Sequence, residues 1–287
     1  MIDQPRVHRS YRTVGGAQLH LRAAGGTGPR VALLHHAPAS AAVWDPLLPP
    51  LAERGLAAVA VDLPGYGGSD RPAAAPDLSW YADRIADFLD LEAPGEPWLV
   101  VGRQTGAAVA AAVAVRRPRL VRGLMLWGYP VFEPALMTRL ATETTDPLTE
   151  ELSSIRHWLA DLHRVDRLAG SDDYVRAALA DHLAAGSEQH WAHNALGRAD
   201  PEALLRLVEQ PIVLVYDLTR TDLPAQLAAV SRARTIVPRA TFVDIAGVSS
   251  SLAPDAVPVL AELVARFATS PASVHPTGTT DGENHRP

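Results

Sequence analysis

The strongest constraint on the fold is an alternation of short apolar strands with longer helical segments between residues 30 and 128. The apolar runs are typical of buried strands and cover Arg30–His35, Leu56–Leu63, Trp98–Gly102 and Leu120–Gly128. The segments between them have helical spacing or are rich in alanine, and cover Ser40–Arg54, Leu78–Leu91 and Thr105–Arg117. Near-continuous apolar strands connected by helices predict an α/β protein with a mostly parallel central sheet flanked by helices.

The rest of the chain extends this sheet and interrupts it once. Arg9–Val14 and Gln18–Ala23 flank two glycines and predict a hairpin, and further strands are expected at Pro211–Tyr216 and Ala240–Ile245 before a last helix at Ala253–Phe267. From about residue 133 to residue 209 only helical patterns occur, at Leu148–Leu162, Asp172–Leu183 and Pro201–Val208. We therefore expect a core domain over 1–132 and 210–268 and a helical cap over 133–209. The polar tail over 269–287 is expected to be disordered.

Composition removes several kinds of chemistry. The 287 residues include no cysteine, and all 26 basic residues other than histidine are arginine. A thiolate nucleophile, a disulfide, a lysine Schiff base and the P-loop lysine are therefore excluded. The net charge of −6 argues against nucleic acid as a partner. No apolar run is long enough for a membrane span and no secretory signal is recognisable, so a cytoplasmic protein that does not bind membranes is expected.

Three ordered motifs resemble those of the α/β-hydrolase superfamily, over roughly residues 15–268. Leu33–Trp44 (LLHHAPASAAVW) is similar to the family's oxyanion-loop segment, and Val61–Pro72 (VDLPGYGGSDRP) to its D-x-P-G-x-G-x-S segment. Val100–Ala110 (VVGRQTGAAVA) occupies the place of the strand, nucleophile elbow and helix. The resemblance implies an α/β-hydrolase fold in which the helical insertion is the cap.

The residues at the three catalytic positions depart from the family's pattern. The elbow reads Gly102-Arg103-Gln104-Thr105-Gly106, so Gln104 stands where the family has its nucleophile. Counting along the segment after Tyr216 places Arg220 at the acid position, and Ser250 falls at the histidine position. The resemblance therefore implies a member without the Ser-His-Asp triad. Asp217 and Asp222 flank Arg220, and a small loop shift could bring Asp222 into the acid position.

Four residues are the candidates for catalysis. The resemblance implies an oxyanion hole made by the backbone N–H groups of Thr105 and Ala37, which depend on no particular side chain. Gln104 can add a hydrogen bond to a substrate carbonyl. His36 replaces a glycine of the family pattern and is suited to proton transfer near neutral pH. Hydrogen bonding of His36 to its own loop is the equally favoured alternative.

Other residues are candidates for substrate binding, each with a structural alternative. Arg103 and Arg220 could bind an acidic or phenolic group or form ion pairs. Asp222 lies near the altered acid position, and Ser250 lies at the altered histidine position. Trp127 and Tyr129 could line an aromatic pocket or simply pack. The insertion holds His157, His163, His182, His190 and His193, yet no carboxylate pattern such as H-E-x-x-H accompanies them, so neither a metal nor another cofactor is expected.

The preferred interpretation is a cofactor-independent, non-hydrolytic enzyme. Its substrate would be a carbonyl-rich, polycyclic or aromatic small molecule, and the reaction a cyclisation or C–C bond formation of aldol or Michael type in natural-product tailoring. The alternatives are a silent ligand-binding pseudoenzyme, a cofactor-free oxygenase or lyase, and a hydrolase with relocated catalytic residues. The protein is expected to be a monomer or a homodimer.

Overall fold

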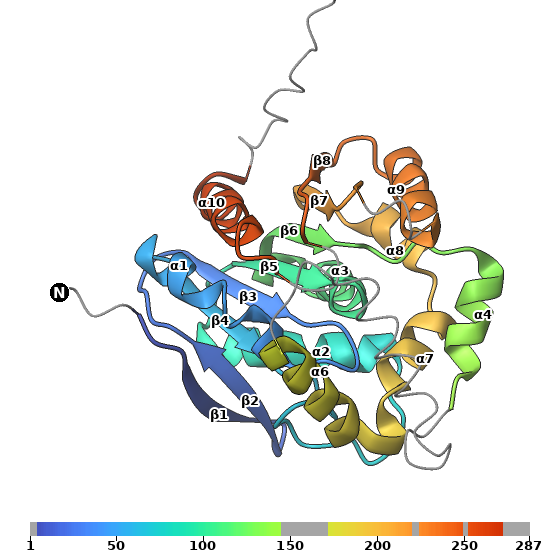
Figure 1. The fold of residues 1–287 in the computed structure, drawn as a ribbon, viewed down its shortest axis with the longest axis horizontal. Helices are drawn as coiled ribbons and strands as arrows, with labels where there is room; N and C mark the ends of the chain where they lie inside the picture. Colours follow the sequence, from blue (N-terminus) through green and yellow to red (C-terminus); the bar gives the residue numbers. More distant parts are fainter. Residues whose placement is uncertain (1–4, 145–171, 220–223, 249–251, 272–287) are drawn as a thin grey trace, which may run out of the picture.

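A computed structural model describes residues 5–144, 172–219, 224–248 and 252–271 of the chain. Its centre is an eight-stranded sheet with the order β1-β2-β4-β3-β5-β6-β7-β8, shown in Figure 1. The strands are β1 (His8–Val14), β2 (Ala17–Ala23), β3 (Arg30–Leu34), β4 (Ala57–Val61), β5 (Trp98–Arg103), β6 (Val121–Trp127), β7 (Ile212–Tyr216) and β8 (Thr241–Asp244).

The sheet is parallel except at one edge. β1 and β2 form the predicted antiparallel hairpin, and β2 also lies antiparallel to β4. All pairs from β4 to β8 are parallel. The strand order reverses at β3, because the chain moves to β4 on one side and then to β5 on the other. Such a switch point leaves a crevice at the carboxyl ends of β3 and β5, where α/β proteins bind ligands.

Helices cover both faces of the sheet. α2 (Leu78–Glu92), α3 (Thr105–Arg116), α8 (Pro201–Leu207) and α9 (Pro224–Ile236) contribute buried residues to one core cluster. α1 (Leu48–Glu53) and α10 (Ala256–Thr269) pack in a second cluster on the opposite face. α3 is buried along nearly all of its length, since its small alanines let it lie close to the sheet. No helix in these described ranges is long and apolar enough to cross a membrane.

The structure differs from the sequence prediction in its helices more than in its strands. The single helix expected over Ser40–Arg54 is instead a 3-10 helix, η1 (Ala41–Trp44), followed by α1. Pro46 lies between them, and a proline has no N–H to donate within a continuous helix. In the insertion, α6 (Asp172–Ala185) and α8 agree with the prediction, whereas α4 (Pro134–Thr142), the 3-10 helix η3 (Gly186–Glu188) and α7 (Trp191–Arg198) were not predicted. Nor was α9. The expected helix at Leu148–Leu162 and most of the tail lie outside the described residues.

Candidate functional site

The centre of the site is the turn that connects β5 to α3. β5 ends at Arg103 and α3 begins at Thr105, so Gln104 alone makes the turn. Its backbone has φ 47° and ψ −111°, and within the described ranges no other non-glycine residue has a positive φ. A conformation of this kind costs about 1–3 kcal/mol and persists only where the surrounding structure imposes it. The Gln104 side chain is exposed, although its neighbours on both sides are buried.

Two glycines impose the turn because the backbone passes very close to them. A Cβ at Gly102 would lie 2.3 Å from the carbonyl oxygen of Gly106, and a Cβ at Gly106 would lie 2.4 Å from the carbonyl oxygens of Leu34 and His35. α3 therefore starts in contact with both β5 and the end of β3. The carbonyl of Gln104 accepts hydrogen bonds from the N–H groups of Ala107 and Ala108, at 2.9 and 3.1 Å. The elbow predicted from the sequence is thus present, with Gln104 at its apex.

The loop after β3 brings His36 to the same place. Leu34 pairs with Gly102 in the sheet register, so His36 and Gln104 each lie two residues beyond a matched pair of neighbouring strands. The loop and the elbow are tied together by a hydrogen bond of 2.7 Å from the Ala37 N–H to Thr105 Oγ1. His36 and Gln104 therefore flank the switch point of the sheet.

This hydrogen bond corrects the predicted oxyanion hole. Ala37 was expected to offer its N–H to a substrate oxygen, but in the structure that N–H donates to the side chain of Thr105. The backbone N–H of Thr105 belongs to the first turn of α3, where donors have no intrahelical acceptor. Of the two expected donors, Ala37 therefore has an internal acceptor, and the role of the Thr105 N–H stays a prediction.

Arg103 and Trp127 lie beneath the elbow. Both side chains are at most 2% exposed, and the guanidinium of Arg103 stacks on the Trp127 ring with its carbon 4.8 Å from the ring centroid. Trp127 also packs edge-on against Trp44 at 5.7 Å. The expectation that Trp127 lines a substrate pocket is therefore wrong, because its ring is enclosed in the core. Arg103 is a buried cation beneath the elbow.

A small cavity lies beside the Gln104 side chain. It has a volume of about 40 Å³, and its other lining residues are Gly128, Tyr129, Phe132, Tyr216, Gln226 and Ala229. Tyr129 lines this cavity, and its hydroxyl donates to the carbonyl of Pro201 at 2.8 Å. This volume is enough for a few waters or a small functional group, and not for a polycyclic body.

Four histidines from the loop after β3 and from the insertion form what we call the histidine cluster: His36, His182, His190 and His193. The rings of His190 and His193 lie 6.3 Å apart, and His190 Nδ1 is 3.6 Å from a carboxylate oxygen of Glu143. Burial lowers the pKa of His36 well below its usual value, and repulsion from Arg103, His193 and His182 lowers it further.

Two of the insertion members, His182 and His193, have pKa values shifted in the same direction. Burial, with repulsion from His190, lowers the pKa of His182 to about 4. The same two causes, with a further contribution from His182, lower the pKa of His193 to about 4. These imidazoles are therefore neutral at physiological pH. Among the described residues, no group of three or more His, Asp or Glu side chains is placed to hold a metal ion.

Asp181, one residue before His182, is a site residue that the sequence interpretation missed. Its Oδ2 accepts hydrogen bonds from the N–H and the hydroxyl of Ser40, at 3.0 and 2.9 Å. Burial and the nearby Asp62 raise the pKa of Asp181 to about 6, against the opposing effect of the Ser40 hydrogen bonds. No motif marks Asp181 in the sequence, because its role depends on a contact between residues 141 positions apart.

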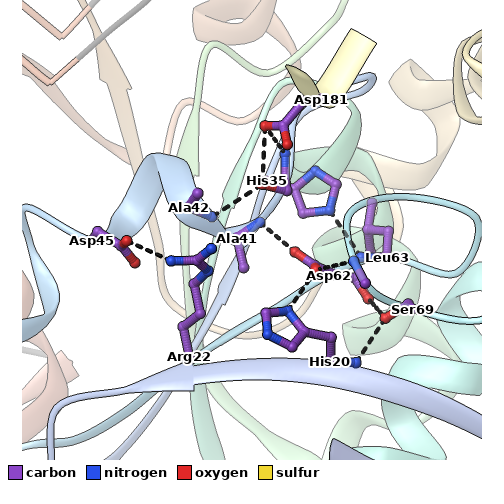
Figure 2. A network of polar contacts seen from close by, with 12 residues as sticks. His20, Arg22, His35, Ala41, Ala42, Asp45, Asp62, Leu63, Ser69 and Asp181 are labelled. Carbon is purple, nitrogen blue, oxygen red and sulfur yellow. Dashed lines mark hydrogen bonds and ion pairs between the residues drawn. The ribbon is translucent and has the colours of Figure 1, made fainter. Parts of the chain in front are cut away.

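The polar network around Asp62 holds these loops in place (Figure 2). Asp62 accepts hydrogen bonds from His20 Nδ1 and from the N–H groups of Ala41 and Gly68, at 2.7, 2.5 and 2.7 Å. Burial alone would raise its pKa, but these hydrogen bonds keep the pKa of Asp62 below the usual value. His35 donates from Nδ1 to the carbonyl of His36 and accepts at Nε2 from the N–H of Leu63, both at 2.9 Å. His35 is therefore a structural residue with both ring nitrogens bonded.

The remaining candidates lie on the loops after β7 and β8. Arg220, Asp222 and Ser250 fall outside the described residues, so their proposed roles stay predictions. Asp217 is 1% exposed and accepts hydrogen bonds from the N–H and hydroxyl of Thr219 and from the N–H of Gly247. It joins the two loops on which the family's acid and histidine positions fall.

Comparison with known proteins identifies the family. The model of the alpha/beta hydrolase fold matches residues 29–200 of this chain, which agrees with the parallel sheet, the switch point and the elbow described above. The chain belongs to the alpha/beta hydrolase fold family.

Several named relatives are hydrolases or dehalogenases. The chain is 28% identical over 236 residues to a 2-(acetamidomethylene)succinate hydrolase from Mesorhizobium japonicum, covering 78% of this chain and 83% of the relative. It is 43% identical to a fluoroacetate dehalogenase from a Burkholderia species, but over only 35% of this chain and 34% of that enzyme.

Solved structures support the same fold. The structure of E-2-(acetamidomethylene)succinate hydrolase has a TM-score of 0.65 at 21% identity, covering 92% of this chain and 100% of that one. An epoxide hydrolase from Vigna radiata has a TM-score of 0.71 at 17% identity, covering 93% and 99%. At these identities the likeness concerns the fold alone.

Proposed function

We propose that this protein is a hydrolase that acts on a small carbonyl compound by direct attack of water, without a covalent acyl-enzyme intermediate. The observation that carries the proposal is Gln104 at the apex of a complete, strained elbow. A primary amide is a poor nucleophile but donates two hydrogen bonds and accepts two, so it can hold a carbonyl group in a fixed orientation. With Arg220 and Ser250 at the other two catalytic positions, the chain lacks the Ser-His-Asp triad.

The roles of the remaining groups follow from their places around the switch point. Gln104 orients the substrate carbonyl, and the N–H of Thr105 stabilises the negative charge that develops on its oxygen. His36, on the neighbouring strand end, takes a proton from the attacking water and returns it to the leaving group. Ring contacts with the organic part of the substrate come from Tyr129, Phe132 and Tyr216, which line the cavity beside Gln104.

The relatives favour hydrolysis over the cyclisation or C–C bond formation that we prefer from the sequence alone. The relatives include a 2-(acetamidomethylene)succinate hydrolase, a haloalkane dehalogenase and a fluoroacetate dehalogenase. None of these names indicates ring closure. Non-hydrolytic chemistry stays as a second candidate on one observation: an elbow with Gln104 can bind a carbonyl but cannot form an ester with it.

The proposal is tested with a panel of small esters and amides, with products identified by mass spectrometry. We expect hydrolysis by the wild-type protein, a fall in kcat of about 10²–10⁴-fold in His36→Gln, and no change in His8→Gln. His8 is a matched control because it is an exposed histidine on β1, at the edge of the sheet. Undiminished turnover in His36→Gln contradicts the assigned mechanism, and products isomeric with the substrate favour the second candidate.

A further inference from the structure

The hydroxyl of Tyr216 is a buried polar group that the reaction above does not use. Tyr216 ends β7 and is 1% exposed, and its hydroxyl has no hydrogen-bond partner within the part of the chain that the structure describes. Tyr129 lines the same cavity, but its hydroxyl donates to the carbonyl of Pro201. Because most buried polar groups in proteins have a partner, a hydroxyl without one at a cavity points to a group that binds there.

The sheet register brings Tyr216 and Gln104 to opposite sides of this cavity. Gln104, Gly128 and Tyr216 each follow the last row of residues matched across β5, β6 and β7. β6 is the middle strand of the three, and Gly128 has no side chain to fill the space between the other two residues. A Cβ at Gly128 would lie 3.6 Å from Gln104 Cγ, so the Gln104 side chain lies over Gly128 on the side of β7. Both residues line the cavity of about 40 Å³.

The cavity is lined by uncharged residues, which determines the kind of group that it accepts. Its seven described lining residues include two primary amides, Gln104 and Gln226, and no acidic or basic side chain. Burial raises the pKa of Tyr216 above its usual 10, against the opposing effect of Arg234, so the hydroxyl stays protonated and can donate at physiological pH. Burying a charged group without a facing opposite charge costs far more than burying a neutral acceptor. The cavity therefore suits a small neutral acceptor.

We propose that the hydroxyl of Tyr216 and the side-chain amide of Gln104 together bind a small neutral carbonyl group of the substrate, an amide, ester or ketone, in the cavity between them. Tyr216 donates to the carbonyl oxygen through its hydroxyl, and Gln104 donates through its NH₂ group. Tyr216 is then a specificity-determining residue, which favours a neutral carbonyl over a carboxylate of the same size. The inference rests on the proposed function, since it names the class of group that the same site binds.

The experiment is an NMR titration of the full chain at pH 7 with acetamide and, separately, with sodium acetate, a charged probe of the same size. The signals followed are the backbone amide of Gly128, which lines the cavity, and the ring carbon of Tyr216 that carries the hydroxyl. Acetamide should shift both signals saturably. Acetate should shift them no more than sodium chloride does at equal ionic strength, which is the control for screening.

A variant tests the hydroxyl itself. Tyr216→Phe removes the hydroxyl and keeps the ring, so the dissociation constant for acetamide, measured on the Gly128 signal, should rise about 2–10-fold for the loss of one neutral hydrogen bond. Tyr11→Phe is the matched control and should leave the constant unchanged, because Tyr11 is a half-exposed tyrosine on the edge strand β1. If Tyr216→Phe does not fold, the comparison of acetamide with acetate in the wild-type protein still decides.

Three results each overturn the inference: no saturable shift with acetamide, equal shifts with acetate, or an unchanged dissociation constant in Tyr216→Phe. These results are distinguishable from failure of the proposed function, because the titration measures binding and the ester and amide panel measures turnover. Acetamide binding that depends on the Tyr216 hydroxyl, together with no turnover of any ester or amide, supports the inference and contradicts the hydrolytic reaction.

Discussion

Two neighbouring histidines, His35 and His36, belong to two very different buried regions. His35 lies in the Asp62 network, where both of its ring nitrogens are hydrogen-bonded. Asp62 itself accepts three hydrogen bonds, one from the His20 ring and two from backbone N–H groups. His36 belongs to the histidine cluster, and its Nδ1 has no hydrogen-bond partner within the described residues. The difference indicates that the first region maintains the fold, whereas the His36 ring contributes fewer hydrogen bonds to it.

The largest effect is expected from removing the charge at the centre of the Asp62 network. Asp62→Asn should lower the free energy of unfolding by about 3–5 kcal/mol, since donors from β2, η1 and the loop after β4 lose a buried anionic acceptor. Urea unfolding measures this change. Asp83→Asn is the matched control, because Asp83 pairs with Arg116 on the surface and should contribute less than about 1 kcal/mol. Equal effects of the two substitutions would contradict the assigned role of Asp62.

Substituting leucine for each of the two adjacent histidines tests the comparison directly. His35→Leu leaves the Leu63 N–H and the His36 carbonyl without partners, and should cost about 1–3 kcal/mol for each group that stays buried. His36→Leu removes a buried nitrogen that has no hydrogen-bond partner among the described residues, so stability should stay within about 1 kcal/mol of wild type or rise. Thermal and urea unfolding give both values. A loss in His36→Leu as large as that in His35→Leu would break the distinction between the two regions.

A smaller effect is expected from the pH dependence of Asp181. Its pKa is about 6 in the folded protein against the usual 3.8, so the folded state holds the proton more tightly. The stability from this group is complete below about pH 4 and is lost as the pH rises through about 6, by at most about 3 kcal/mol. His182 and His193 contribute with the opposite sign, because their pKa values are lowered. The measurement is therefore the difference in unfolding free energy between wild type and Asp181→Asn.

That difference should fall between about pH 4 and pH 6 and be constant above pH 7. A difference that rises over the same interval, or does not change, would show that Asp181 is not a protonated buried group at low pH. Arg22 and Asp62 both face Asp181 and are unchanged in the variant, so their contributions cancel in the comparison.

The sequence predicts the centre of the sheet well because β3 to β7 are largely apolar on both faces and therefore recognisable without their partners. It fails over Ser40–Arg54, where Pro46 interrupts the helical spacing, and it misses α4, α7 and α9, of which α4 and α7 span only nine and eight residues. The elbow is predictable from Gly102 and Gly106, since only glycine allows the close approach of the backbone there.

The chemical environment of the site is much less accessible from the sequence. Neither the acceptor of the Ala37 N–H nor the burial of Trp127 follows from a local pattern. Asp181 and His193 reach the site only because the insertion folds back over the loop after β3. Contacts of this kind join residues far apart in the chain, and a motif search cannot detect them.

The central claim is that the elbow of this protein binds a substrate without forming a covalent bond to it. The most direct test is the intact mass of the protein after incubation with a fluorophosphonate probe and, separately, with an activated ester, with a serine hydrolase of the same fold as positive control. The account predicts that the mass of this chain is unchanged under conditions that fully label the control. A stoichiometric adduct on any residue beside Gln104 would contradict it.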